Sequence, residues 1–349
     1  MKRKLLALLL MLACLPGWAD EARRKKLDND VRYLVNQHRG QLEAGIAIIH
    51  PASGEMVSLN GTTPFPLASV FKVPIMIEVA RRIQAGSLSR TTSFTINEAE
   101  KCIGSGQLQH SRNGTTVSLD RCMRLMMSIS DNTATDMLFN HIGHDSVNQM
   151  MTGLGLTHSD IFMNNRTAWL LSLGRAPGLS GLGPMAIARR WLAMSQPQRH
   201  QLAETVFEKS KTLSLKQFQA IEDGSSAQSD QEDAAVAAAM DNLASPEDMG
   251  WLLAKLVAGE LLDPTQTAYC LDVMAGQKYH TRIPSLLDAS VPIYHKTGTL
   301  AGIRNDAGII ELPSGDYLIV VGFTRQVRGE SKADRLIAQV ARLAYQAYR

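Results

Sequence analysis

The sequence predicts a mixed α/β (α+β) fold: a five-stranded antiparallel sheet flanked by terminal helices, with an all-helical domain inserted between its strands. Two observations support this prediction. Strand-like segments gather near the two ends of the chain, whereas the long middle section has the apolar spacing of helices. Short turns rich in proline, glycine and serine separate neighbouring strand segments, as in antiparallel hairpins. We expect residues 20–65 and 285–349 to form the sheet domain and residues 66–284 to form the helical domain.

The elements of the sheet domain follow from the apolar patterns and the turns between them. An amphipathic helix is predicted over residues 28–38, and a closing helix over residues 331–348. Turns at residues 51–54 and 313–316 each join two strands. The five predicted strands cover residues 45–50, 56–59, 291–299, 307–312 and 317–324.

The first nineteen residues have the pattern of an export signal. A basic start, Lys2-Arg3-Lys4, precedes an apolar run over residues 5–15 and the small-x-small sequence Gly17-Trp18-Ala19. The apolar run is too short to cross a membrane. We therefore expect cleavage after Ala19, a mature chain without a transmembrane segment, and a periplasmic location.

The charge balance argues against two classes of partner. The whole chain has a formal net charge of +3, and the predicted signal carries three basic residues and no acid, so the mature chain is close to neutral (3 − 3 = 0). A neutral chain gives no reason to expect a nucleic acid or an anionic membrane surface as partner. The remaining residues, about 330, can bury a large core, and we expect a monomer.

The cysteine and histidine patterns predict no metal site and no cofactor. An exported protein can form disulfides, which leaves a Cys102–Cys122 pair open and one thiol over, and Cys270 lies in an apolar stretch expected to be buried. The cysteine spacing matches no zinc site. The histidines that lie closest together lack an acidic or cysteine partner at a defined spacing: His141, His144 and His158.

One short stretch pairs a candidate nucleophile with a candidate base. In Ser69-Val70-Phe71-Lys72 the serine and lysine are three residues apart, directly before an apolar helical pattern. Residues at i and i+3 share a helix face, and a helix N-terminus disfavours a nearby ammonium, so a neutral Lys72 could activate the Ser69 hydroxyl. Taken alone, such a tetrapeptide is more often a solvated serine and lysine at a helix start.

Two further motifs change that balance. Ser130-Asp131-Asn132 opens another apolar helix, and its hydroxyl and amide suit proton relay and the holding of a substrate amide. Lys296-Thr297-Gly298-Thr299 ends a predicted strand, where a cation, a hydroxyl and a strand edge can bind an extended substrate that bears a carboxylate. Each motif alone is weak evidence for an active site, but the three together in this order are strong evidence.

In these motifs the chain resembles the serine β-lactamases of class A and the penicillin-binding proteins. The resemblance extends to the segments around the motifs and to residues 244–253, and it covers most of the mature chain. It implies a β-lactamase/transpeptidase-like fold and attack by a serine on a β-lactam or on an acyl-D-Ala-D-Ala amide.

The resemblance also implies a role for each matched residue. Ser69 is the acylated nucleophile, Lys72 is the general base of acylation, and Ser130 passes a proton to the leaving nitrogen. Asn132 orients the substrate amide, and Lys296 and Thr297 hold the substrate carboxylate. The oxyanion hole is the backbone N–H groups of Ser69 and Thr299. Arg304 matches a position at which some class A enzymes keep a carboxylate-binding arginine, and a solvated hairpin residue is an equal alternative.

The chain departs from the class A pattern in one loop. Class A enzymes use a glutamate there to activate the deacylating water, but residues 156–166 contain no glutamate. By spacing, the glutamate's place falls near Asn164 or Asn165, whose amides cannot accept a proton from water. Asp160 is the nearest acid, and it could substitute only if the loop takes another path.

Residues 174–240 have no counterpart in the resemblance and are interpreted as an insertion. They begin with a glycine-rich run, continue with amphipathic helices around Trp191 and Phe207, and include a polar tract over residues 223–233. That composition predicts a surface loop for the tract. A lid or a partner-docking arm is the functional alternative.

These observations predict a periplasmic serine hydrolase that acts on β-lactams through a Ser69 acyl-enzyme and deacylates slowly. Two alternatives stay open. One is a D-alanyl-D-alanine carboxypeptidase or peptidoglycan peptidase, and the other is a non-catalytic sensor of β-lactams or muropeptides. The expected partner is accordingly a small β-lactam or a peptidoglycan stem peptide.

Overall fold

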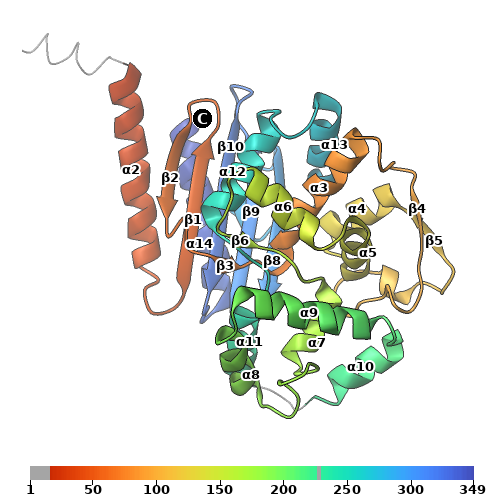
Figure 1. Ribbon diagram of the computed structural model, residues 1–349. Helices are drawn as coiled ribbons and strands as arrows, with labels where there is room; N and C mark the ends of the chain where they lie inside the picture. The colour runs from red at the N-terminus through yellow and green to blue at the C-terminus, as the bar shows by residue number, and fades with distance from the viewer. Residues whose placement is uncertain (1–15, 226–228) are drawn as a thin grey trace, which may run out of the picture.

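The computed structural model describes residues 16–225 and 229–349. Five strands form the main sheet in the order β2-β1-β10-β9-β8, and each neighbouring pair is antiparallel. The prediction of a five-stranded antiparallel sheet built from both ends of the chain is confirmed (Figure 1). The strands are β1 (Glu43–His50), β2 (Glu55–Leu59), β8 (Ile293–Leu300), β9 (Ile303–Glu311) and β10 (Tyr317–Arg325).

Strand β9 differs most from its prediction, because it begins four residues before the predicted start at residue 307. Leu300 pairs with Ile303, so only Ala301 and Gly302 form the turn, and Gly302 takes a positive φ of 66°. The three residues after Ile303 are polar and yet buried, so an apolar pattern does not reveal them: Arg304, Asn305 and Asp306.

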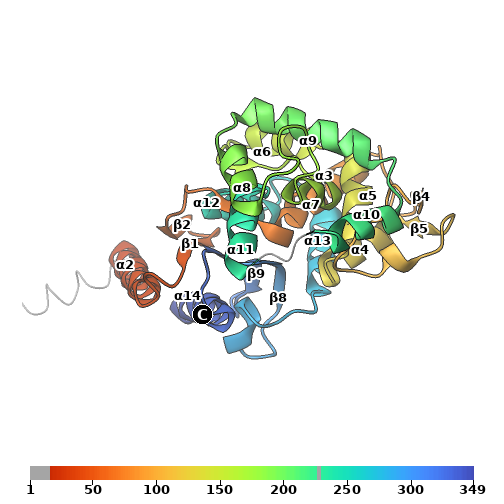
Figure 2. The same cartoon turned by 90° about the horizontal axis from the view of Figure 1, so that it is seen from below.

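Helices from the two chain ends cover one face of the sheet (Figure 2). They are α2 (Pro16–Asn36) and α14 (Glu330–Tyr348), and Leu27 and Val31 of α2 join the same apolar cluster as Leu336 and Ile337 of α14. Helix α2 starts earlier than the predicted 28–38 and runs through the predicted cleavage site; residues 1–15 of the predicted signal lie outside the described residues. Across residues 16–225 and 229–349, no helix is both long and apolar enough to cross a membrane.

The helical domain packs on the opposite face of the sheet. Helix α12 (Pro246–Val257) lies directly against β1 and β10. A Cβ added at Gly250 would lie 2.9 Å from Ile49 Cδ1, so a glycine allows this close approach. The helices around α12 share the largest apolar cluster with the sheet. They are α3 (Lys72–Gln84), α4 (Leu119–Ser128), α5 (Asn132–Ile142), α6 (Asp145–Gly153) and α13 (Pro264–Ala275).

Short strands and 3₁₀ turns connect the two domains. Strand β7 (Leu243–Ala244) pairs with both β3 (Phe65–Pro66) and β6 (Ser159–Asp160), and this small sheet lies beside the segment that carries Ser69. The remaining short elements are β4 (Ser93–Thr95), β5 (Thr116–Ser118), η1 (Ala68–Phe71), η2 (Leu108–His110) and η3 (Ile283–Leu286).

The predicted insertion is a group of helices at one end of the molecule (Figure 1). The helices expected around Trp191 and Phe207 are confirmed, and with α7 they enclose their own apolar cluster. The polar tract is not a loop throughout, because Asp230–Asp233 open a helix whose Ser229 and Glu232 form a capping box. The helices of the insertion are α8 (Pro184–Leu192), α9 (Gln196–Ser210), α10 (Leu215–Asp223) and α11 (Asp230–Ala239), and α7 (Asn165–Ser172) directly precedes it.

The three cysteines of the described chain are free and buried, as expected for Cys270. The Cys102–Cys122 disulfide left open by the sequence is not formed. Cys102 packs in the apolar cluster of the insertion and Cys122 in the large cluster shared with the sheet, so the two thiols belong to different cores.

Candidate active site

Ser69 lies on the 3₁₀ turn η1, which runs directly into helix α3. Its neighbours Val70 and Phe71 are buried in the large core and hold the turn in place, while Ser69 is half-buried and lines a cavity. Ala68 takes a φ of +45°, which is uncommon for a residue other than glycine. Its N–H donates to Asp241 Oδ2 at 2.5 Å, so a carboxylate supports the strained residue beside Ser69.

Lys72 is fully buried one helical turn after Ser69. Its Nζ donates to the Ser130 carbonyl at 2.8 Å, to Ser130 Oγ at 2.9 Å and to Asn132 Oδ1 at 2.9 Å. Burial lowers the pKa of Lys72 to about 8. A substantial neutral fraction therefore exists at neutral to mildly alkaline pH, as a proton acceptor requires.

Ser130 takes a φ of +60°, and Asp131 fixes the turn around it. The Asp131 carboxylate accepts the N–H of Ala134 at the start of α5, and those of Gln107 and Leu108 from a separate loop. A Cβ at Gly106 would lie 2.3 Å from Asp131 Cγ, so this packing requires a glycine.

Lys296, on β8, is also fully buried and reaches the same hydroxyl. Its Nζ donates to Ser130 Oγ at 3.2 Å and to the Thr297 carbonyl at 2.8 Å. Burial and the nearby charge of Lys72 hold the pKa of Lys296 well below its usual value. The structure thus brings together Lys72, Ser130, Asn132 and Lys296, as the three motifs predicted.

Strand β8 passes very close to the segment that precedes Ser69. A Cβ at Gly298 would lie 2.5 Å from the Leu67 carbonyl oxygen, so the Lys-Thr-Gly motif needs its glycine for this contact. Thr299, on the next position, lines the same cavity as Ser69, as expected of two residues predicted to share an oxyanion hole.

Arg282 supports this strand and was missed by the sequence reasoning. Its guanidinium is buried and donates to the carbonyls of Gly298 (2.9 Å) and Asn305 (2.6 Å) and to Thr299 Oγ1 (2.7 Å). Nε pairs with Asp334 Oδ1 at 2.6 Å. No local motif marks this residue, because its partners come from three other parts of the chain.

The cavity beside Ser69 has a volume of about 590 Å³. One wall comes from the helical domain and β8, and the other comes from the loop before α7 and from the insertion. Among its apolar members are Met163, Trp169, Met240 and Leu300, and its polar members include Ser69, Asn132, Asn164, Asn165, Thr299, Glu222, Asp233 and Asp241.

Asn164 and Asn165 both line this cavity, in the loop where the glutamate is missing. Asn164 caps α7, because its Oδ1 accepts the Thr167 N–H at 2.8 Å. Asn165 donates through its backbone N–H and Nδ2 to Asp136 Oδ1, at 2.8 and 2.7 Å. Asp160 does not line the cavity, and its Oδ1 pairs with His200 Nε2 at 2.8 Å, so the loop does not bring it to Ser69.

Arg304 lies away from the cavity lining. It is buried, its Nη1 donates to the Leu300 and Ile303 carbonyls at 2.8 Å each, and its Nη2 pairs with Glu330. Arg304 is therefore not solvated, as the hairpin alternative required. In this conformation its guanidinium is bound to groups of the protein. His295 is a buried residue of strand β8, and its Nδ1 lies 3.0 Å from Asp306 Oδ1.

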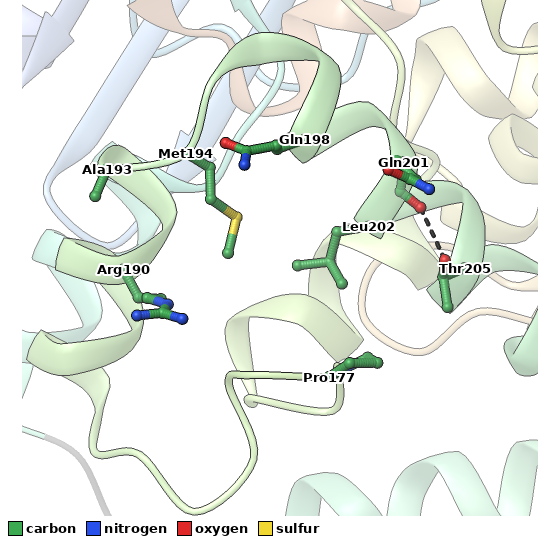
Figure 3. Close-up of a pocket in the computed structure, with 8 residues that line it drawn as sticks. All are labelled: Pro177, Arg190, Ala193, Met194, Gln198, Gln201, Leu202 and Thr205. Atoms are coloured by element: carbon green, nitrogen blue, oxygen red, sulfur yellow. Dashed lines mark hydrogen bonds between the residues drawn. The ribbon is translucent and has the colours of Figure 1, made fainter.

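Two observations concern residues outside the Ser69 cavity. No group of three or more histidines, cysteines or acids in the described chain could hold a metal ion. A second cavity of about 420 Å³ lies in the insertion between α8 and α9 (Figure 3). Arg190 is the charged residue of its lining, which otherwise holds amides, Thr205 and apolar side chains.

A family model described as the beta-lactamase enzyme family matches residues 25–348 of this chain. The chain belongs to the beta-lactamase enzyme family. It is a β-lactamase-like serine hydrolase, and its fold matches that of a class A β-lactamase and of PBP-A.

The relatives of this β-lactamase-family chain carry more than one function in their names. The beta-lactamase regulatory protein BlaB of Streptomyces cacaoi is 25% identical over 310 residues, which cover 87% of this chain and 92% of BlaB. The extended-spectrum beta-lactamase PER-1 of Pseudomonas aeruginosa is 22% identical, over 97% of this chain and 92% of PER-1. A solved PBP-A variant, in an acyl-enzyme complex with penicillin G, is 23% identical with a TM-score of 0.67, over 93% of this chain and 96% of its own.

Proposed function

We propose that the protein is a periplasmic serine hydrolase that β-lactams acylate at Ser69 and that releases the acyl group slowly. The observation that carries the proposal is the buried Lys72–Ser130–Lys296 network beside a half-buried Ser69, opposite a loop that offers two amides instead of a carboxylate.

Acylation follows from the groups in this network. Neutral Lys72 takes the Ser69 proton, directly or through a water, and Ser69 Oγ attacks the carbonyl carbon. The N–H groups of Ser69 and Thr299 stabilise the oxyanion. As the C–N bond breaks, the Ser130 hydroxyl donates its proton to the leaving nitrogen and takes one back from Lys72. Lys296 and Thr297 attract the substrate carboxylate, and Asn132 orients the substrate amide.

Deacylation needs a water held against the ester and a group that takes its proton. Asn164 and Asn165 can hold a water but cannot take its proton. Loss of a general base typically slows a step by about 10²–10⁴-fold. This supports a long-lived acyl-enzyme.

The first test is intact mass spectrometry after mixing with a penicillin. We expect one acyl group on the protein within seconds to minutes, persisting long enough for detection, and none on Ser69→Ala. The matched control is Ser172→Ala, which removes a serine that lines the same cavity on α7. Labelling that survives Ser69→Ala, or rapid turnover with no detectable intermediate, would contradict the proposal.

Two other functions share the acylation step and differ in how the acyl group is released. Slow release, and a relative named a regulatory protein, favour a sensor that stays acylated. A peptidoglycan peptidase would instead release peptide acyl groups quickly and β-lactam acyl groups slowly. Release rates measured with a penicillin and with an acyl-D-Ala-D-Ala peptide separate the three functions: both fast for a β-lactamase, peptide alone for a peptidase, neither for a sensor.

The periplasmic part of the proposal rests on the pattern of residues 1–19. Osmotic-shock fractionation should release the protein, and N-terminal sequencing of the released protein should begin at Asp20. A protein found only in the cytosolic fraction with its first residues intact would contradict it.

A further inference from the structure

Three carboxylates line the Ser69 cavity, and the sequence reasoning used none of them: Glu222, Asp233 and Asp241. Glu222, at the end of α10, accepts the indole N–H of Trp169 at 2.5 Å. Asp233, in the first turn of α11, is exposed. Asp241 differs from both, because it is bound directly to the segment that carries the nucleophile.

The position of Asp241 is fixed from two sides. Its Oδ2 accepts the N–H of Ala68, the residue before Ser69, at 2.5 Å, and its Oδ1 accepts the N–H of Asn242 at 2.9 Å. Asn242 in turn holds the loop of the missing glutamate, since its Oδ1 accepts the N–H groups of Phe162 (2.9 Å) and Met163 (3.0 Å). Asp241 therefore lies between the nucleophile's segment and the loop that has lost its carboxylate.

The other acids near this loop are already occupied. Asp136 accepts from Asn165 through one oxygen and from the Arg166 N–H through the other, and it does not line the Ser69 cavity. Asp160 pairs with His200. Asp241 accepts the N–H groups of Ala68 and Asn242, and the N–H of Leu67, which donates to the Asn242 carbonyl, also faces it. Asp241 differs from Asp136 and Asp160 because it lines the Ser69 cavity, where its oxygens can accept a further hydrogen bond from water.

We propose that Asp241 is the general base that activates the deacylating water at Ser69. The proposal rests on the proposed acylation of Ser69. Asp241 takes a proton from water, and the water oxygen attacks the carbonyl carbon of the Ser69 ester. The oxyanion is held by the N–H groups of Ser69 and Thr299. As the C–Oγ bond breaks, Asp241 returns the proton to Ser69 Oγ, and the acid product is released.

The same surroundings make the proposed release pH-dependent. Burial raises the pKa of Asp241 to about 7, so about half of the molecules carry the carboxylate at neutral pH. Only the carboxylate can accept a proton, so the release rate should rise with pH through about 7. The other titratable groups that line this cavity are Glu222 on α10 and Asp233 on α11. Lys72, on α3, is buried and donates to Ser130.

The test is Asp241→Asn, with acylation and release measured separately by rapid-mixing intact mass spectrometry between pH 5.5 and 8.5. Asparagine keeps an oxygen that can accept the Ala68 N–H, so the turn before Ser69 retains its support. We expect acylation within about threefold of the unmodified protein and release slowed by about 10²-fold or more. The pH dependence near 7 should disappear, and Asp241→Glu should restore part of the release. Asp233→Asn, which removes the same charge from the same cavity, should change release by less than about threefold.

The release rate in the presence of hydroxylamine distinguishes a general base from a residue with a structural role only. Because it attacks an ester without a base, it should speed release from Asp241→Asn by a larger factor than from the unmodified protein. Release from Asp241→Asn within threefold of the unmodified rate would overturn the proposal while leaving Ser69 acylation intact. Loss of acylation in folded Asp241→Asn would overturn it in favour of a structural role. Failure of the unmodified protein to acylate would instead refute the proposed function.

Discussion

Lys72 and Lys296 donate to the same hydroxyl, Ser130 Oγ, at 2.9 and 3.2 Å. Both amines are fully buried, and two buried ammonium groups around one oxygen repel each other, so burial and mutual charge lower the pKa of Lys296. The arrangement favours a neutral amine next to Ser130 until an anion arrives. In the proposed function a substrate carboxylate supplies that anion, and Ser130 then passes a proton between an amine and the leaving nitrogen.

The first prediction separates the two lysines. Lys72→Ala should slow acylation by every substrate by about 10²-fold or more, because a proton acceptor is lost. Lys296→Ala should weaken carboxylate-bearing substrates far more than analogues without the carboxylate. In the unmodified protein, acylation should rise with pH through about 8, where Lys72 becomes neutral. Acylation rates for a penicillin and for its ester analogue test this, and equal impairment of both variants on both substrates would contradict the division of roles.

A second prediction concerns how the insertion is attached to the active site. The buried Arg166 guanidinium donates to the carbonyls of Glu98 and Lys101 in the helical domain, and to those of Ser210 and Leu213 in the insertion. Arg166→Met leaves these carbonyls without a donor, so we expect the free energy of unfolding to fall by about 3 kcal/mol.

Urea denaturation measures this loss. Arg199→Met is the matched control, because the half-exposed Arg199 also donates to two carbonyls, those of Trp191 and Leu192. It should cost less than about 1 kcal/mol. Equal losses in the two variants would show that Arg166 is not the link between the two parts.

Sequence patterns predicted the sheet and the three motifs well because their signals are local. Turn residues and alternating apolar positions mark the strands, and Ser69 and Lys72 are three residues apart. The start of β9 was missed because Asn305 and Asp306 are polar but buried, held by contacts that no window of sequence contains. The start of α11 could have been found, since Ser229 and Glu232 have the spacing of a capping box.

Asp241 and Arg282 could not have been found in this way. Asp241 reaches the nucleophile's segment across 173 residues of sequence, and Arg282 binds carbonyls 16 and 23 residues away. Their positions follow from how β7 pairs with β3 and how η3 packs beside β9, which are tertiary relationships. Class A enzymes carry a glutamate in the loop that residues 156–166 form here, and this chain lacks it. The carboxylate that we propose as the base, Asp241, directly follows the insertion instead.

The last prediction returns a carboxylate to the loop itself. Asn165 is half-buried and lines the cavity, whereas Asn164 is buried and caps α7, so Asn165→Glu is the less disruptive substitution. The new carboxylate would lie beside Asp136, to which Asn165 now donates at 2.7 Å, and this like charge should raise the glutamate's pKa and cost about 1–2 kcal/mol of stability. Even so, a second base at the cavity should speed release of a penicillin acyl group by about tenfold or more.

Asn165→Gln is the control, because it changes the same hydrogen bonds to Asp136 without adding a base, and its release rate should not increase. If Asn165→Glu and Asn165→Gln released the acyl group at the same rate, the loop would not hold the water that attacks the Ser69 ester, and Asp241 would act on a water bound elsewhere in the cavity.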